Sequence, residues 1–152
     1  MRLAELDVRL NGAVDDIGAR RPETADSVRT GLCLLWERLQ QVHELCAEVD
    51  ERTWTAYKTG LDRGLTELSA ELVQAPAPAA ADLVYAHAGR LEVDGWVLRL
   101  DLAGREGPVE GRELVAGVAK EIDQYHAAVA AGDAPARTEV ERALNELRGA
   151  AS

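Results

Sequence analysis

The chain has 152 residues and a formal net charge of −10, from 17 basic and 27 acidic side chains. This length suits one domain, and a hydrophobic share of 47% excludes a chain that is disordered throughout. Nucleic-acid binding and docking on an anionic membrane both need clustered Lys and Arg, whereas the acidic excess here is the same in residues 1–78 and 79–152. The composition therefore predicts neither nucleic-acid nor membrane binding. It favours solubility and, less strongly, a basic protein partner.

The cysteines and the first residues indicate a compartment. No stretch approaches the ~18 apolar residues of a membrane span, and Glu5 and Asp7 stand where a signal peptide would need its apolar segment. Cys33 and Cys46 are 13 residues apart, which places them on different faces of one helix, so they cannot form a disulfide within it. We expect a cytoplasmic protein in which both thiols are small core residues.

Two amphipathic helices are predicted before residue 50. Residues 2–19 carry apolar side chains at three- and four-residue spacing, and Gly18 and Pro22 end that helix. A second helix begins near Thr24 to Ser27 and has the most regular stripe in the chain. The members of that stripe are Val28, Leu32, Leu35, Leu39, Val42, Cys46 and Val49.

The stripe then shifts by one residue and continues through Trp54, Tyr57, Leu61, Leu65, Leu68 and Leu72. A tight turn at residues 50–53 between antiparallel helices explains the shift, and so does one long helix with an irregularity. We favour the turn, because a helix over residues 24–74 would be about 75 Å long. That length exceeds what a compact domain of this size accommodates.

An Ala/Pro segment over residues 75–81 is the clearest break in the sequence. Pro76 and Pro78 at alternate positions are incompatible with a helix interior and favour a stiff, extended connection. This linker separates a helical half, residues 1–74, from a second half, residues 82–149.

Residues 90–102 alternate between apolar and polar side chains on both sides of Asp94-Gly95. Asp-Gly between alternating residues is a strong hairpin signal, because a type I′ turn needs two positive φ angles. The alternative is a helix over residues 80–102, in which one inward stripe would leave Val93 and Trp96 outside. We favour the hairpin, because it accounts for more residues.

Two further helices are predicted after a loop at residues 104–108. The first runs from about residue 111 to 131 and is capped by Gly132. The second opens at Asp133-Ala134-Pro135 and ends at Gly149. Their inward residues are predicted to be Leu114, Val115, Val118, Ile122, Tyr125, Val129, Val140, Ala143, Leu144 and Leu147.

The three histidines fall on three different segments, so each could place one imidazole inside a bundle. Cys46 follows His43 by one turn, and Asp123 precedes His126 by one turn, so each pair could donate two ligands to one metal ion. The candidate metal ligands are therefore His43, Cys46, His87, Asp123 and His126. No HExxH, ExxH or CxxC motif accompanies them, so ordinary histidines at helix boundaries are the simpler interpretation.

Trp36, Trp54 and Tyr57 are the candidate residues for a small-molecule pocket between helices. Aromatic side chains at helical spacing more often belong to the core. No nucleophile or phosphate-loop motif is present, so we assign no catalytic residue and no cofactor.

These observations predict one mostly helical domain over residues 1–152, a compact bundle with a β-hairpin near residues 90–102. The function that fits best is a non-enzymatic interaction or regulatory protein, which acts on a protein partner or on a second copy through helical surfaces. The alternative is a small helical-bundle protein, an enzyme included, that binds a ligand or a metal ion through His43, His87 and His126.

Overall fold

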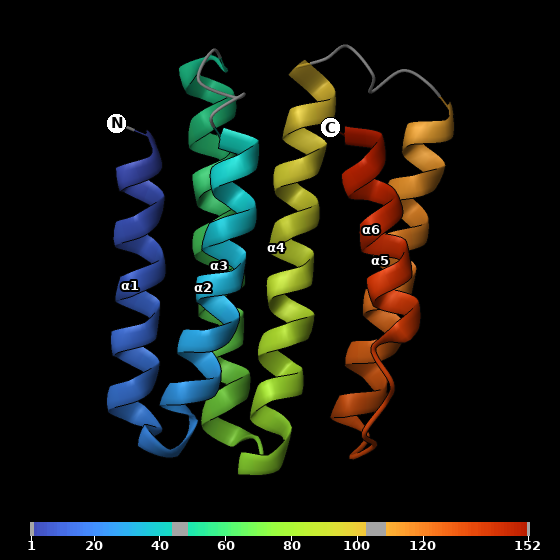
Figure 1. Cartoon of the computed structure of the whole chain (residues 1–152). Helices are drawn as coiled ribbons and strands as arrows, with labels where there is room; N and C mark the ends of the chain where they lie inside the picture. Colours follow the sequence, from blue (N-terminus) through green and yellow to red (C-terminus); the bar gives the residue numbers. More distant parts are fainter. Residues whose placement is uncertain (1, 44–48, 103–108, 152) are drawn as a thin grey trace.

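The computed structural model describes residues 2–43, 49–102 and 109–151, and over these ranges it contains six α-helices and no strand (Figure 1). The mostly helical fold class is therefore confirmed. Two 3₁₀ turns, Pro22–Thr24 and Ala77–Ala79, precede the second and the fourth helix. The helices are α1 (Arg2–Arg20), α2 (Ala25–His43), α3 (Glu51–Gln74), α4 (Ala80–Leu102), α5 (Val109–Ala130) and α6 (Thr138–Ala151).

Helix α4 occupies the centre of the molecule. Consecutive helices run antiparallel, and α4 packs against α2, α3, α5 and α6 (Figure 1). With α1, α2 and α3 it completes a four-helix arrangement, and with α5 and α6 it forms a three-helix arrangement. The two halves of the chain are therefore joined through one shared helix.

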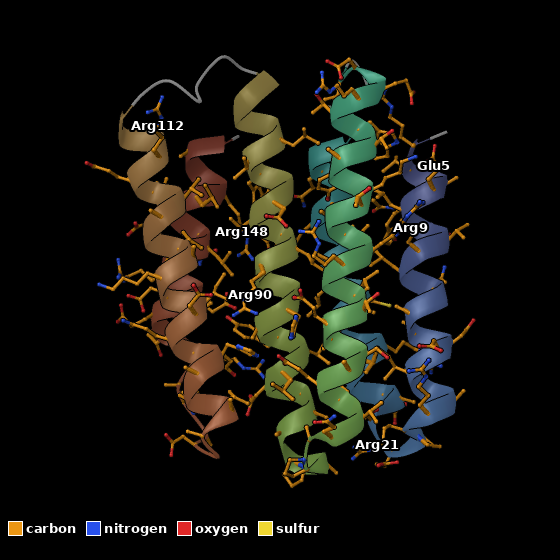
Figure 2. All side chains as sticks on the ribbon, turned by 180° about the vertical axis from the view of Figure 1, so that it is seen from behind. Glu5, Arg9, Arg21, Arg90, Arg112 and Arg148 are labelled. Atoms are coloured by element: carbon orange, nitrogen blue, oxygen red, sulfur yellow. The ribbon has the colours of Figure 1, made fainter. Side chains whose placement is uncertain are left out.

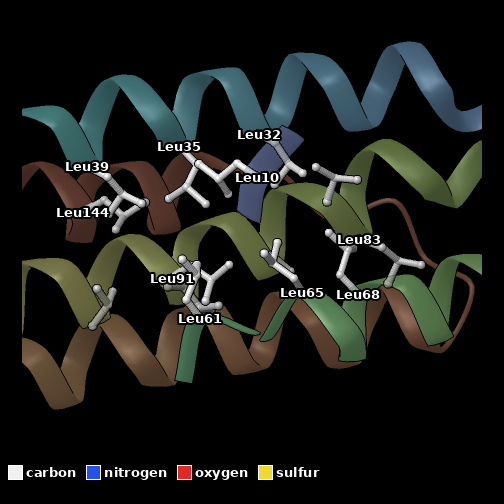
Figure 3. Close-up of a cluster of buried hydrophobic side chains, with 14 of the residues drawn as sticks. Leu10, Leu32, Leu35, Leu39, Leu61, Leu65, Leu68, Leu83, Leu91 and Leu144 are labelled. Carbon is white, nitrogen blue, oxygen red and sulfur yellow. The ribbon is translucent and has the colours of Figure 1, made fainter. Parts of the chain in front are cut away.

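The core is one cluster of buried apolar side chains that draws on all six helices. Figure 3 shows part of this cluster, where leucines of α2 and α3 meet those of α4 and α6. The stripes predicted from the sequence supply most of it. Their buried members are Leu6, Leu10, Ile17, Val28, Leu32, Leu35, Leu39, Val49, Trp54, Leu61, Leu65, Leu68, Leu72, Val118, Ile122, Tyr125, Val129, Val140, Ala143, Leu144 and Leu147.

The predicted separation of α2 and α3 is confirmed, and the single long helix is wrong. Asp50 caps α3: its carboxylate accepts a hydrogen bond of 2.7 Å from the backbone N–H of Thr53. Residues 51–53, which the sequence placed in the turn, therefore form the first turn of α3. The stripe shifts by one residue because the chain leaves one helix and enters another.

The predicted β-hairpin is wrong, because residues 90–102 lie within α4. A helix that is covered on all sides carries no single apolar stripe. Val93 and Trp96, which a one-sided helix would expose, are both buried because neighbours surround α4. The alternation around Asp94-Gly95 therefore reflects all-round burial and not a period of two.

The Ala/Pro segment forms a short connection between α3 and α4. A 3₁₀ turn over Ala77–Ala79 leads directly into α4. The Arg21 guanidinium donates hydrogen bonds of 2.7–3.0 Å to the carbonyl oxygens of Leu72, Val73 and Ala75, and so caps the C-terminal end of α3 (Figure 2).

The C-terminal helices follow the predicted order with one shifted boundary. Gly132 has a φ of +92° and ends the α5 segment, where the N–H of Asp133 bonds to the carbonyl of Ala128 at 3.0 Å. Helix α6 begins at Thr138, three residues after the predicted start at Pro135. The predicted loop at residues 104–108 lies outside the described residues.

The prediction that Cys33 is a core residue is wrong, because this free cysteine is exposed on α2. It follows the buried Leu32 by one position, which turns its side chain about 100° away from the inward stripe. Cys46 lies outside the described residues.

Candidate metal centre

Two histidines and one glutamate meet where α3, α4 and α5 adjoin. The Nε2 atoms of His87 and His126 lie 2.8 Å and 2.9 Å from the same carboxylate oxygen, Oε2 of Glu71. The two imidazole rings are edge to face, with centroids 5.3 Å apart. One potential metal-ligating atom from each of the three residues lies within 4.8 Å of the other two.

The antiparallel topology brings these residues together from positions far apart in the sequence. Glu71 lies in the last turn of α3, His87 lies two turns into α4, and His126 lies near the end of α5. These parts of the three helices lie at the same end of the bundle, because each helix reverses the direction of the one before it (Figure 1). Glu71 shares a face of α3 with the buried Leu68, one turn earlier.

Burial differs sharply among the three side chains. His87 is 2% exposed, whereas the side chains of His126 and Glu71 are 19% and 36% exposed. Burial lowers the pKa of His87 below its usual value, although the hydrogen bond and the charge of Glu71 oppose that change. His87 is therefore a neutral imidazole at pH 7, which is the form that binds metal ions.

Glu71 is the anion of the cluster. Partial burial raises the pKa of its carboxyl group, but the hydrogen bonds from His126 and His87 outweigh burial, and the pKa lies below its usual value. An ionised carboxylate only accepts hydrogen bonds. Both Nε2 atoms therefore carry a proton and donate it to Glu71.

Arg90 and Asp123 form a second layer around His126. Nη2 of Arg90 lies 3.1 Å from Nδ1 of His126 and 3.1 Å from Oδ1 of Asp123 (Figure 2 labels Arg90). Asp123 precedes His126 by one turn of α5, and its side chain is 68% exposed. Asp123, predicted as a ligand, therefore contacts the candidate centre through Arg90.

This set of atoms matches the ligand chemistry of a divalent transition metal. Imidazole nitrogen and carboxylate oxygen bind Zn²⁺ at about 2.0–2.2 Å, which places two ligands of a tetrahedral site about 3.3 Å apart. The two Nε2–Oε2 distances to Glu71, 2.8 and 2.9 Å, need to lengthen only slightly to reach that spacing. Three protein ligands would leave one position for water or another small ligand.

Of the five predicted metal ligands, the structure brings His87 and His126 together. His43 is the last residue of α2, at the opposite end of the bundle from the start of α4, and nothing is described of its side chain (Figure 1). Sequence reasoning missed Glu71, because no spaced motif joins it to either histidine. The available signal was a carboxylate beside the stripe residue Leu72, one turn from the end of a predicted helix.

The predicted aromatic pocket residues lie on two helices. Trp54 is buried and stacks on Tyr57 with ring centroids 5.7 Å apart, while Arg2 and Lys58 place cations over the Trp54 ring. Trp36 is half-buried on α2 and packs against the core. The two clefts described in this structure are lined by other residues.

The larger of these two clefts has a volume of about 520 Å³. It lies between α2 and α6, on the face of α4 opposite the histidine cluster. Its lining includes Leu34 and Arg38 of α2, Tyr85 and Glu92 of α4, and Arg148 of α6. In its wall, Arg148 donates two hydrogen bonds of 2.6 and 2.8 Å to the buried carboxylate of Glu92. Helix α4 thus carries the histidine cluster on one face and this cleft on the other.

Comparison with known proteins gives no relative: no family model, no curated protein and no solved structure matches the chain. None of the helices, as far as they are described, combines the length and apolar character needed to cross a membrane.

Proposed function

We propose that the protein binds a divalent transition metal ion, with Zn²⁺ as the first ion to test, through Glu71, His87 and His126. The observation that carries this proposal is the shared contact of two imidazole Nε2 atoms with one oxygen of Glu71, at 2.8 and 2.9 Å. Imidazole nitrogen and carboxylate oxygen are ordinary ligands of Zn²⁺, and helical bundles build metal sites from side chains on facing helices.

The bound ion would fasten three helices to one another. Helix α3 belongs to the four-helix arrangement, α5 belongs to the three-helix arrangement, and α4 belongs to both. One ion held by a residue from each helix would therefore link the two halves of the chain. We infer a metal-dependent gain in stability, because an ion that binds only the folded state shifts the unfolding equilibrium.

The first test is thermal unfolding of the full chain with and without Zn²⁺. At a free Zn²⁺ concentration of about 100 Kd, the gain in unfolding free energy is about 2.7 kcal/mol. For a chain of this length that gain raises Tm by about 5 to 10 °C. We expect the Glu71→Gln variant to lose most of this increase, because an amide oxygen is neutral and a weaker ligand.

Glu67→Gln is the matched control for this measurement. It removes one carboxylate from an exposed position of α3, one turn before Glu71. We expect Zn²⁺ to raise its Tm as much as that of the wild type. An unchanged Tm of the wild type in Zn²⁺, or equal increases in both variants, would contradict the proposed site.

A second candidate function, self-association through helical surfaces, is favoured by the cleft between α2 and α6. Leu34 lines this cleft and is 57% exposed, so a second copy that covered the cleft would bury this apolar side chain. Light scattering at increasing protein concentration tests for a dimer, and Leu34→Glu is expected to keep the chain monomeric. A wild type that stays monomeric throughout would exclude this function.

A further inference from the structure

Arg90 holds one histidine of the candidate metal centre from the side opposite Glu71. One nitrogen of its guanidinium, Nη2, is 3.1 Å from Nδ1 of His126, while Nε2 of the same ring is 2.9 Å from Glu71. The ring therefore lies between a cation at Nδ1 and an anion at Nε2.

The chemistry of arginine determines which ring nitrogen of His126 carries the proton. A guanidinium has five N–H donors, no acceptor, and a charge that it keeps at any ordinary pH. Nδ1 must therefore accept the hydrogen bond from Arg90 with its lone pair. The proton of the neutral ring is on Nε2, where it is donated to Glu71.

A metal ion bound at Nε2 of His126 requires the other arrangement. The ion takes the lone pair of Nε2, so the proton leaves Nε2 and a proton is taken up at Nδ1, and the ring stays neutral. Nδ1 then carries an N–H that needs an acceptor. Arg90 offers only donors, so two N–H groups would face each other across the present contact.

Asp123 is the acceptor within reach. It precedes His126 by three residues on α5, so the two side chains share a helix face. The same Nη2 of Arg90 now lies 3.1 Å from each of them. Histidines that bind metal ions commonly donate their second N–H to a carboxylate, which orients the ring and strengthens the ligand.

From this geometry we infer that Arg90 and Asp123 set the metal affinity of the centre in opposite directions. Arg90 stabilises the metal-free form of His126, and metal binding exchanges Arg90 for Asp123 as the partner of Nδ1. This inference rests on the proposed function, since it concerns the same centre. Arg90 and Asp123 are positioning residues and not ligands.

The inference predicts opposite changes in Zn²⁺ affinity, measured by calorimetric titration of the full-length chain. We expect Arg90→Met to bind Zn²⁺ about 10-fold more tightly than the wild type, because nothing then opposes the proton on Nδ1. We expect Asp123→Asn to bind about 10-fold more weakly, the lower end of the range for such outer partners. Arg112→Met removes one positive charge at the other end of α5 and is expected to bind like the wild type (Figure 2).

Nitrogen NMR of the histidine rings gives a readout that a general change in charge would not produce. Without metal, Nε2 of His126 should be protonated and Nδ1 unprotonated, and Zn²⁺ should reverse this pattern. A protonated Nδ1 in the metal-free wild type would overturn the inference.

The outcomes of the titration separate this inference from the proposed function. If the wild type binds Zn²⁺ and Arg90→Met binds it equally tightly, the inference fails and the metal site stands. If only Arg90→Met binds Zn²⁺, the opposing role of Arg90 is supported, and the proposed function of the wild type is contradicted. If no variant binds Zn²⁺, the metal site itself is wrong.

Discussion

Replacing Arg148 by alanine is expected to destabilise the fold by about 3–5 kcal/mol, the typical cost of removing one partner from a buried ion pair. Glu92 is 5% exposed and accepts two hydrogen bonds from Arg148, at 2.6 and 2.8 Å. Without the guanidinium, the hydrogen-bond donor that remains for this carboxylate among the described residues is the neutral indole N–H of Trp96, at 2.9 Å. An uncompensated carboxylate would then be left within the core between α4 and α6.

Urea unfolding of three further variants tests this explanation. Arg142→Ala is the control, because Arg142 forms exposed pairs on the same helix, and it is expected to cost less than about 1 kcal/mol. The double variant Glu92→Leu/Arg148→Leu removes both charges and should recover most of the loss, whereas Glu92→Leu alone leaves an unpaired arginine. A double variant no more stable than Arg148→Ala would contradict the explanation.

Replacing Gly31 by valine is the second change with a large expected effect, a loss of about 3 kcal/mol, at the upper end of overpacking costs. A Cβ atom on Gly31 would lie 2.1 Å from Cγ1 and 3.4 Å from Cβ of Val84. Helices α2 and α4 approach each other closely at this point, and Val84 is fully enclosed by the core. The two helices would therefore have to separate.

Gly12→Val is the matched control for that prediction. Gly12 is exposed in the middle of α1 and nothing would meet its Cβ atom, so we expect a change within about 0.5 kcal/mol. Adding Val84→Ala to Gly31→Val should recover part of the stability, since it removes the methyl groups that clash. Equal unfolding midpoints in urea for Gly31→Val and Gly12→Val would show that α2 and α4 are not packed this closely.

Helices that face solvent on one side could be predicted from the sequence, and the central helix could not. The stripe of Val28, Leu32, Leu35 and Leu39 identifies the inward face of α2 because its other side meets water. Helix α4 has neighbours on every side, so its apolar residues follow no period of 3.6. The alternation around Asp94-Gly95 was then the strongest local pattern.

The candidate metal centre was predictable in part for a related reason. Periodicity places His87 and His126 on helices, but it does not say which helices adjoin or which of their ends meet. Glu71 joins the two histidines only through the three-dimensional arrangement of α3, α4 and α5. Local spacing instead suggested His43 with Cys46, and Asp123 with His126, as pairs of metal ligands. Residues three positions apart on one helix are the kind of pair that periodicity can identify.

X-ray diffraction from crystals grown with Zn²⁺, recorded at the zinc absorption edge, is the measurement that tests the central claim most directly. We expect an anomalous peak about 2.0–2.2 Å from Nε2 of His87, from Nε2 of His126 and from a carboxylate oxygen of Glu71. The electron-density map from the same crystal should show Nδ1 of His126 facing Asp123. A map with no peak among these three side chains, or with zinc only at exposed carboxylates elsewhere, would contradict the account.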